Sequence, residues 1–323
     1  MAFVHSHLPR FPASLLSSKL YRQPFCRIKV FPFLWCCARE SFGAVGKLSL
    51  IDLDPQHQAF AEKTNTTSAN SKRIQPILVL QGDTLQVFWY QRIVTCTTLC
   101  ILATLFLRNI QYTTQALSSQ EYTSLLEAIP RALQLVTMDI GCLFMGYIAA
   151  DFFSGLVHWF LDNYGNERTP FIGKQCVAFQ GHHQHPWTIT HRPFCNLLAT
   201  TCLISCPFLF LLLVAPIPHF IQIIFTSFGF FTVFAQQTHQ WAHQAKPPSS
   251  WITFLQQMGI LLSVKAHGKH HQPPFHKNYC IVSGICNEFL DNIQFYGKLE
   301  HYLYTQWGWV PHHVQKKGNL HAQ

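Results

Sequence analysis

Eight histidines stand in four clusters along the chain, and their spacing points to metal binding. The clusters are His158, His182-His183, His239-x-x-x-His243 and His267-x-x-His270-His271. Imidazole suits borderline metals such as iron, copper and zinc, and eight such side chains exceed what a single ion can use. The sequence therefore predicts a site for two metal ions.

The spacing within the clusters fits helices that present several ligands on one face. His239 and His243 are one helical turn apart, so they can hold one ion or bracket two. The stretch from His267 to His271 carries ligands at i, i+3 and i+4. The adjacent pair His182-His183 cannot point one way on a regular helix, which favours a loop or a helix end that supplies both ions.

Polar side chains near the histidines are candidates for orienting the ligands. Asp162 lies one turn beyond His158, and a carboxylate that accepts the second ring N–H of a ligand fixes its tautomer and raises its basicity. Asp151 lies deeper in the apolar run, where an ionisable side chain is costly and often functional; a hydrogen bond between packed helices is the alternative. Gln180 and Asn287 are further candidates.

Four apolar segments are long enough to cross a bilayer as helices, which requires about 20 mostly apolar residues. They run approximately over Val87 to Leu107, Ala132 to Ala150, Asn196 to Ala215 and Ile217 to Ala235. A short turn with two prolines separates the last two, which favours a tight helical hairpin. The sequence thus predicts an all-α integral membrane bundle of about four transmembrane helices.

This topology brings every histidine cluster to one membrane face. The second span ends before His158, the third begins after the His182-His183 pair, and the fourth ends before His239. Because the same face carries most of the Lys and Arg residues, the histidines should face cytosol or stroma. Two mixed stretches, Ser250 to Ser263 and Phe289 to Tyr302, are predicted to form helices that lie at the interface.

Composition excludes several classes of protein. Hydrophobic residues make up 49% of the chain and charged residues 11%, which argues against a soluble globule. The formal charge is +9, but Lys and Arg form no basic stripe, so we expect no nucleic-acid partner. Anionic lipid head groups account for the surplus. No serine elbow, phosphate loop or dinucleotide fingerprint occurs, which argues against a serine hydrolase, a kinase and a nicotinamide-binding enzyme. Any electrons that the reaction needs must therefore come from a separate partner.

The first 71 residues are interpreted as a transit peptide followed by a polar linker. This stretch is rich in Ser, Arg and Lys, and no acidic residue precedes Glu40. It lacks a continuous apolar core followed by a small-residue cleavage site, which disfavours secretion. A plain disordered tail is the alternative. Residues 85–323 are predicted to form the folded domain.

Four motifs occur in order along the C-terminal part of the chain. They are DFFSGLVHWFLD (151–162), QGHHQHPWTIT (180–190), THQWAH (238–243) and VKAHGKHHQPPFHKNYCIVSG (264–284). In these motifs the chain resembles the membrane lipid desaturases, a family that includes plasmanylethanolamine desaturases and the plastid phosphatidylglycerol palmitate desaturases of plants. QGHH-x-x-PWTIT and HQWAH resemble most the plastid branch.

The resemblance implies a non-haem diiron site with the eight histidines as ligands. Such a site uses O2 and two electrons to remove two hydrogens from an unactivated acyl or alkyl chain. The plastid branch implies a chloroplast membrane, palmitate in phosphatidylglycerol as substrate, a trans double bond near the carboxyl end, and ferredoxin as donor. The alternative is an endoplasmic-reticulum enzyme that acts on an ether lipid, plasmanylethanolamine, with cytochrome b5.

Two other classes of function compete with this interpretation. A histidine-rich haem carrier or metal transporter is one, although transport favours ionisable residues within the spans rather than at one face. A zinc-dependent membrane hydrolase is the other, but it needs only three protein ligands and would leave the remaining histidines without a role. The number of clustered histidines therefore favours the two-metal interpretation.

Overall fold

The computed structural model of the protein describes residues 79, 83–119 and 124–314. Over these residues the regular structure is helical, without strands. Four helices are long and apolar enough to cross a membrane: α3 (Trp89–Ser118), α4 (Leu125–Asn163), α6 (Phe194–Val214) and α7 (His219–Ala242). The all-α class with four candidate spans is confirmed. The predicted leader, residues 1–71, lies outside the described residues.

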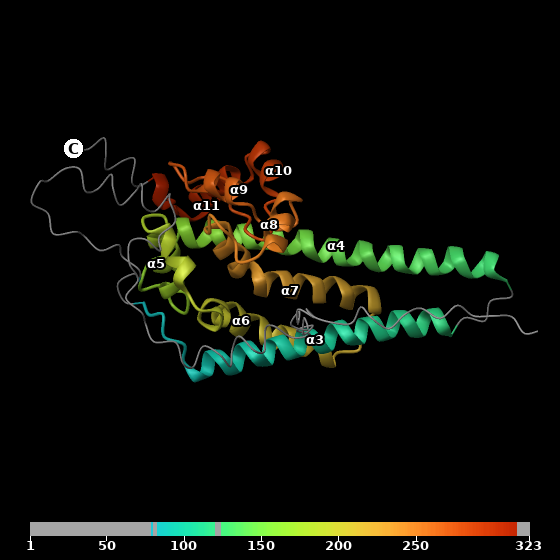
Figure 1. The fold of residues 1–323 in the computed structure, drawn as a ribbon. Helices are drawn as coiled ribbons and strands as arrows, with labels where there is room; N and C mark the ends of the chain where they lie inside the picture. The colour runs from blue at the N-terminus through green and yellow to red at the C-terminus, as the bar shows by residue number, and fades with distance from the viewer. Residues whose placement is uncertain (1–78, 80–82, 120–123, 315–323) are drawn as a thin grey trace, which may run out of the picture.

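The four long helices run side by side, with the hairpin of α6 and α7 between α3 and α4 (Figure 1). α3 packs on α6, and α4 packs on α7. Gly146 of α4 permits the second contact, because a Cβ atom there would fall against the backbone carbonyl of Ile224 in α7. Small residues let membrane helices approach closely in this way.

The α4 helix extends well beyond the apolar run that predicted it. It continues through Ala150 to Asn163 without a break, so the candidates Asp151, His158 and Asp162 all lie on one helix. α3 likewise outruns its prediction and reaches Ser118. The lengths of the apolar runs located the membrane spans. The helices continue through further turns that contain polar residues, and hydropathy does not mark where those turns end.

Short helices gather over the end of the bundle where α4 and α7 finish (Figure 1). They are α5 (Gly173–His182), the 3-10 helix η3 (Pro186–His191), α8 (Ser250–Gln257), α9 (Val264–His270), α10 (Asn287–Asn292) and α11 (Phe295–Trp307). α8 is shorter than predicted. The helix expected over Phe289 to Tyr302 is split between α10 and α11, because Gln294 adopts a left-handed conformation with φ 54°.

Asp151 ties this cap to the bundle. Its Oδ1 accepts hydrogen bonds from the backbone N–H groups of Ser283 at 2.8 Å and Gly284 at 2.9 Å, and its Oδ2 accepts one from Cys286 at 3.0 Å. Hydrogen bonds of this kind satisfy a buried carboxylate without a counter-ion. The carboxylate of Asp151 therefore anchors a backbone turn rather than a histidine ring.

Candidate metal centre

All eight predicted histidines meet beneath the cap, carried by α4, α5, α7 and α9 and the residues that follow them. They form two groups, and within each group the candidate ligand atoms all lie within 4.8 Å of one another. The five-histidine group consists of His182, His239, His243, His267 and His271, and the Asp162 group consists of His158, Asp162, His183 and His270. The predicted topology thus places every cluster at one end of the bundle.

The five-histidine group cannot be satisfied by hydrogen bonds alone. The Nε2 atom of His243 lies 2.8 Å from Nε2 of His182, 2.8 Å from Nε2 of His267 and 3.2 Å from Nε2 of His239. A neutral imidazole nitrogen offers one hydrogen or one lone pair, so it cannot bond three neighbours at once. An octahedral ion with ligands at about 2.1 Å spaces neighbouring nitrogens by about 3.0 Å, which matches this group.

Burial keeps these imidazoles in the neutral form that metals bind. Burial, reinforced by repulsion between neighbouring rings, lowers the pKa of His182, His243 and His267 well below the usual value. The pKa of His271 is lowered by the same causes. A neutral ring with a free lone pair is ready to coordinate a cation without first releasing a proton.

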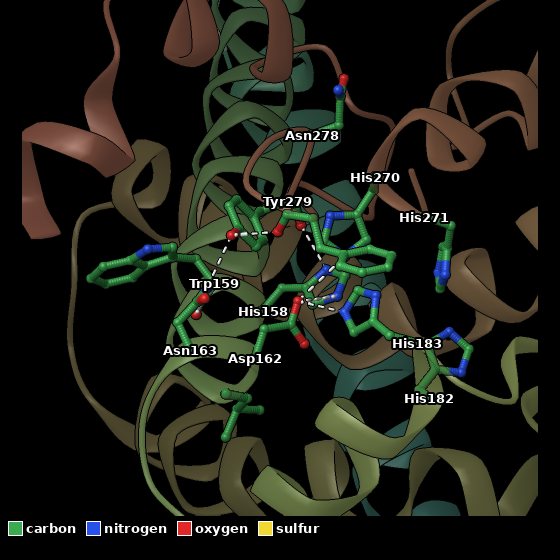
Figure 2. A network of polar contacts seen from close by, with 12 residues as sticks. His158, Trp159, Asp162, Asn163, His182, His183, His270, His271, Asn278 and Tyr279 are labelled. Carbon is green, nitrogen blue, oxygen red and sulfur yellow. Dashed lines mark hydrogen bonds and ion pairs between the residues drawn. The ribbon is translucent and has the colours of Figure 1, made fainter. Parts of the chain in front are cut away.

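In the Asp162 group, two backbone carbonyls decide which ring nitrogen is free. The Nδ1 atom of His158 lies 2.9 Å from the carbonyl oxygen of Tyr279, and Nδ1 of His270 lies 2.8 Å from that of Lys277. A carbonyl oxygen can only accept, so each Nδ1 carries the hydrogen and each Nε2 keeps a lone pair in the neutral ring. Both lone pairs are directed at Oδ2 of Asp162 (Figure 2).

Two hydrogen-bond acceptors, the ring nitrogens of His158 and His270, therefore face a third acceptor, the carboxylate of Asp162. Nε2 of His158 lies 3.4 Å and Nε2 of His270 3.3 Å from the Asp162 oxygen. Neither nitrogen has a hydrogen-bond partner in the described part of the chain, and both are buried. Buried lone pairs that face one another are unfavourable unless a cation lies between them. The residues therefore fit a bound metal ion.

Asp162 differs from its predicted role in one respect. The sequence suggested that it accepts the outward N–H of His158, but the Tyr279 carbonyl takes that hydrogen bond. Asp162 instead lies on the inner side, with Oδ2 3.0 Å from Nε2 of His183, which places its carboxylate among the candidate ligands. Sequence reasoning missed the carbonyls of Tyr279 and Lys277, whose only signal was their place within the last motif.

Gln180 and Asn287 hold backbone segments close to the site. The Gln180 amide donates to the carbonyl of Gly165 at 3.2 Å, which ties α5 to the end of α4. Asn287 donates to the carbonyl of Cys280 at 3.1 Å and accepts from its N–H at 2.8 Å. The second pair fixes the residue next to Tyr279, so it positions the carbonyl that His158 contacts.

Two of the predicted clusters divide between the groups. His182 ends α5 and joins the five-histidine group, whereas His183 follows the helix and joins the Asp162 group. His267 of α9 and His271, which follows the helix, face one group, whereas His270 faces the other, a division that the sequence left open. The ring centres of His183 and His271 are 5.0 Å apart, so the two groups are adjacent.

Comparison with known proteins identifies the family. A sequence profile described as the lipid desaturase domain matches residues 147–314, which is more than half of the chain and includes every candidate ligand. The chain belongs to the lipid desaturase domain family. No solved structure matches it.

Curated relatives of this chain fall into two kinds. It is 46% identical over 172 residues to fatty acid desaturase 4, chloroplastic, of Arabidopsis thaliana, covering 52% of each chain. It is 32% identical over 177 residues to the plasmanylethanolamine desaturase of Myxococcus xanthus, covering 53% of this chain and 63% of that one. For plasmanylethanolamine desaturase 1 of Mus musculus the identity is 34% over 170 residues, covering 48% and 61%. The chain therefore spans about half the length of the Arabidopsis protein.

Proposed function

We propose that the protein is an O2-dependent membrane lipid desaturase that uses two iron ions to insert a double bond into an acyl chain. The observation that supports this proposal is the convergence of buried lone pairs in two adjacent groups at the end of four apolar helices. Imidazole and carboxylate ligands suit iron, and the exposed apolar side chains of the long helices suit contact with a hydrocarbon substrate.

The number of ligands argues against a zinc hydrolase, and the spacing of the rings argues against a haem carrier. A zinc hydrolase needs three protein ligands and an open position, but the five-histidine group alone offers five. A haem carrier needs space for a flat macrocycle between its axial histidines. The ring centre of His243 lies only 4.5 Å from the ring centres of His182 and His267, and the rings meet edge to face. This leaves no space for a haem plane between them.

The reaction consumes one O2, two electrons, two protons and two hydrogens of a saturated chain, and it yields one double bond and two waters. Iron bound to these residues would supply the activation of O2. The chain contributes neutral nitrogens, and the carbonyls of Tyr279 and Lys277 hold the tautomers of His158 and His270. Five of the eight rings are buried, which limits the access of water and with it the side reactions of an oxidising centre.

We propose palmitate in phosphatidylglycerol as the substrate, a trans double bond near the carboxyl end as the product, and a chloroplast membrane as the location. The similarity to a relative named as a chloroplastic fatty acid desaturase supports this proposal, as do the motifs of the plastid branch and the composition of the leader. Ferredoxin is then the electron donor, and the site faces the stroma.

The alternative is an ether-lipid desaturase of the endoplasmic reticulum that uses cytochrome b5. The relatives named as plasmanylethanolamine desaturases favour it. A fluorescent protein fused to residues 1–71 separates the two, because the main proposal expects import into chloroplasts. Fluorescence retained on the endoplasmic reticulum would support the alternative.

Expression in a host with an analysable lipidome tests the reaction itself. We expect a new unsaturated palmitate in phosphatidylglycerol, and no such product from a His182→Ala variant expressed at the same level. A new vinyl-ether lipid would assign the alternative substrate. An unchanged lipid profile from protein that carries its full metal content, with either donor supplied, would contradict the desaturase proposal.

A further inference from the structure

A line of aromatic rings begins at the Asp162 group. The ring centre of Tyr279 lies 5.0 Å from that of His270 and 5.9 Å from that of His158 (Figure 2). The next ring, Tyr296, is 4.8 Å from Tyr279, and Trp159 is 5.9 Å from Tyr296. Tyr279 is fully buried, and the other two aromatic side chains are nearly so.

The line continues from Trp159 to solvent. Tyr164 lies 5.3 Å from Trp159, and Trp309 lies 6.1 Å from Tyr164. Trp309 is 47% exposed, and its neighbour Trp307, at 5.8 Å, is 59% exposed. Successive ring contacts therefore join the candidate ligands to an exposed pair of tryptophans.

The residue types along the line are selective. The chain holds 28 Phe against 10 Tyr and 8 Trp, yet every ring on the line is Tyr or Trp. Phe152, Phe160 and Phe295 pack beside the line instead. Packing alone would accept Phe, and a buried hydroxyl or indole N–H costs free energy unless it finds a partner. Phenols and indoles, unlike a phenyl ring, give up an electron readily.

Trp159 also has a base for its proton. Its indole N–H donates to Oε1 of Glu300 at 2.9 Å, and Oε2 of Glu300 lies 3.6 Å from Nε2 of His313. Burial raises the pKa of Glu300, which makes its carboxylate a stronger base. An indole that loses an electron becomes acidic, so Glu300 is placed to take the proton as the electron leaves.

We propose that Tyr279, Tyr296, Trp159, Tyr164 and Trp309 form a relay that drains oxidising equivalents from the metal centre to the surface, with Glu300 as the proton acceptor of Trp159. The inference rests on the proposed function, since only an O2-activating centre would oxidise these rings. The relay operates when oxygen has been activated and no lipid chain is present to give up hydrogen.

An electron passes from Trp159 through Tyr296 and Tyr279 to the oxidised centre, and the indole proton moves to Glu300. A soluble hydrogen donor of the ascorbate class then returns an electron to Trp159 through Trp309 and Tyr164 and releases a proton to solvent, while Glu300 returns its proton to the indole. In two such cycles one ascorbate becomes dehydroascorbate, and its two electrons and two protons take the place of the two lipid hydrogens. Together with the two electrons and two protons of the ordinary donor, they convert one O2 to two waters.

Rapid-freeze electron paramagnetic resonance on the iron-loaded, reduced full-length chain tests the relay after mixing with O2 in the absence of lipid. We expect a tryptophan radical, and its loss in Trp159→Phe, which keeps an aromatic ring at the position. Trp251→Phe is the matched control, because Trp251 is an exposed tryptophan of α8 outside the line. The same tryptophan signal in wild type and Trp159→Phe would overturn the proposal.

Two gentler variants test the function of the relay. Trp309→Phe removes its exit, and Glu300→Gln keeps an acceptor for the indole N–H but cannot take the proton. Both should keep the wild-type initial rate with lipid, yet lose activity and accumulate oxidised Tyr279 peptides faster in lipid-free turnover with ascorbate. Equal inactivation and equal peptide oxidation in all chains would overturn the relay while iron content and lipid desaturation still supported the proposed function. Protein without iron or product would overturn both.

Discussion

The Oδ2 atom of Asp162 lies 3.0 Å from Nε2 of His183, so a carboxylate of α4 and an imidazole beyond α5 converge on one point. Asp162→Asn should remove the negative charge there while keeping the size of the side chain. We expect the metal content per chain to fall and activity to drop by more than the 10- to 100-fold roughly typical of residues behind the ligands. Elemental analysis with lipid profiling measures both, and a full metal content would contradict a ligand role.

Asp151→Asn offers a contrast on the same helix. Its carboxylate accepts three backbone hydrogen bonds and contacts the cap rather than the rings. Hydrogen bonds to a charged group contribute about 1.5–3 kcal/mol each, so we expect a loss of stability of about 2–3 kcal/mol after partial compensation by the amide. Thermal unfolding in detergent should shift downward, whereas the folded fraction keeps its metal. Metal loss at unchanged stability would reverse this assignment.

Single ligand removals should differ between the two groups. His270→Ala leaves three of the four candidate ligands in the Asp162 group, whereas His271→Ala leaves four of five in the other. We therefore expect both variants to lose desaturase activity but His270→Ala to lose more metal. His276→Ala, outside both groups, serves as the control. Equal metal loss from the two groups would show that their ligand numbers do not determine retention.

The close contact of α4 and α7 should be needed to bring the ligands together. A Cβ atom at Gly146 would meet backbone atoms of Ile224 and Phe228, whereas a Cβ atom at Gly141 would meet nothing within 4 Å. Gly146→Ala should therefore separate the helices and lower both the melting temperature and the metal content. Gly141→Ala on the same helix should change neither. Two equally stable variants would indicate that α7 shifts at no cost.

The sequence predicted which histidines come together better than how they are arranged. Spacing of one turn placed His239 and His243 together, because helix geometry is local and regular. The lengths of the apolar runs predicted the four long helices, because the length and composition of a span can also be judged from local sequence. The inward position of Asp162 depends on the carbonyl of Tyr279, which reaches His158 from a segment distant in sequence. No local rule indicates which backbone oxygen will approach a given ring.

The cap shows the same limit. Pattern alone suggested one interfacial helix over Phe289 to Tyr302, but the left-handed Gln294 divides it. The division of α9 between the groups was also beyond local rules, because it depends on how α5 and α4 pack against it. Long-range packing therefore decided the orientation of elements whose existence the sequence had indicated.

The seven-residue helix α9 and the residue after it contribute to both groups, with His267 and His271 in one and His270 in the other. A helix this short has little stability of its own. Metal coordination would hold α9 against α4, α5 and α7, so that metal binding would complete the tertiary structure. In a cell that lacks iron, the metal-free protein would then be degraded by proteases rather than accumulate in an inactive folded form.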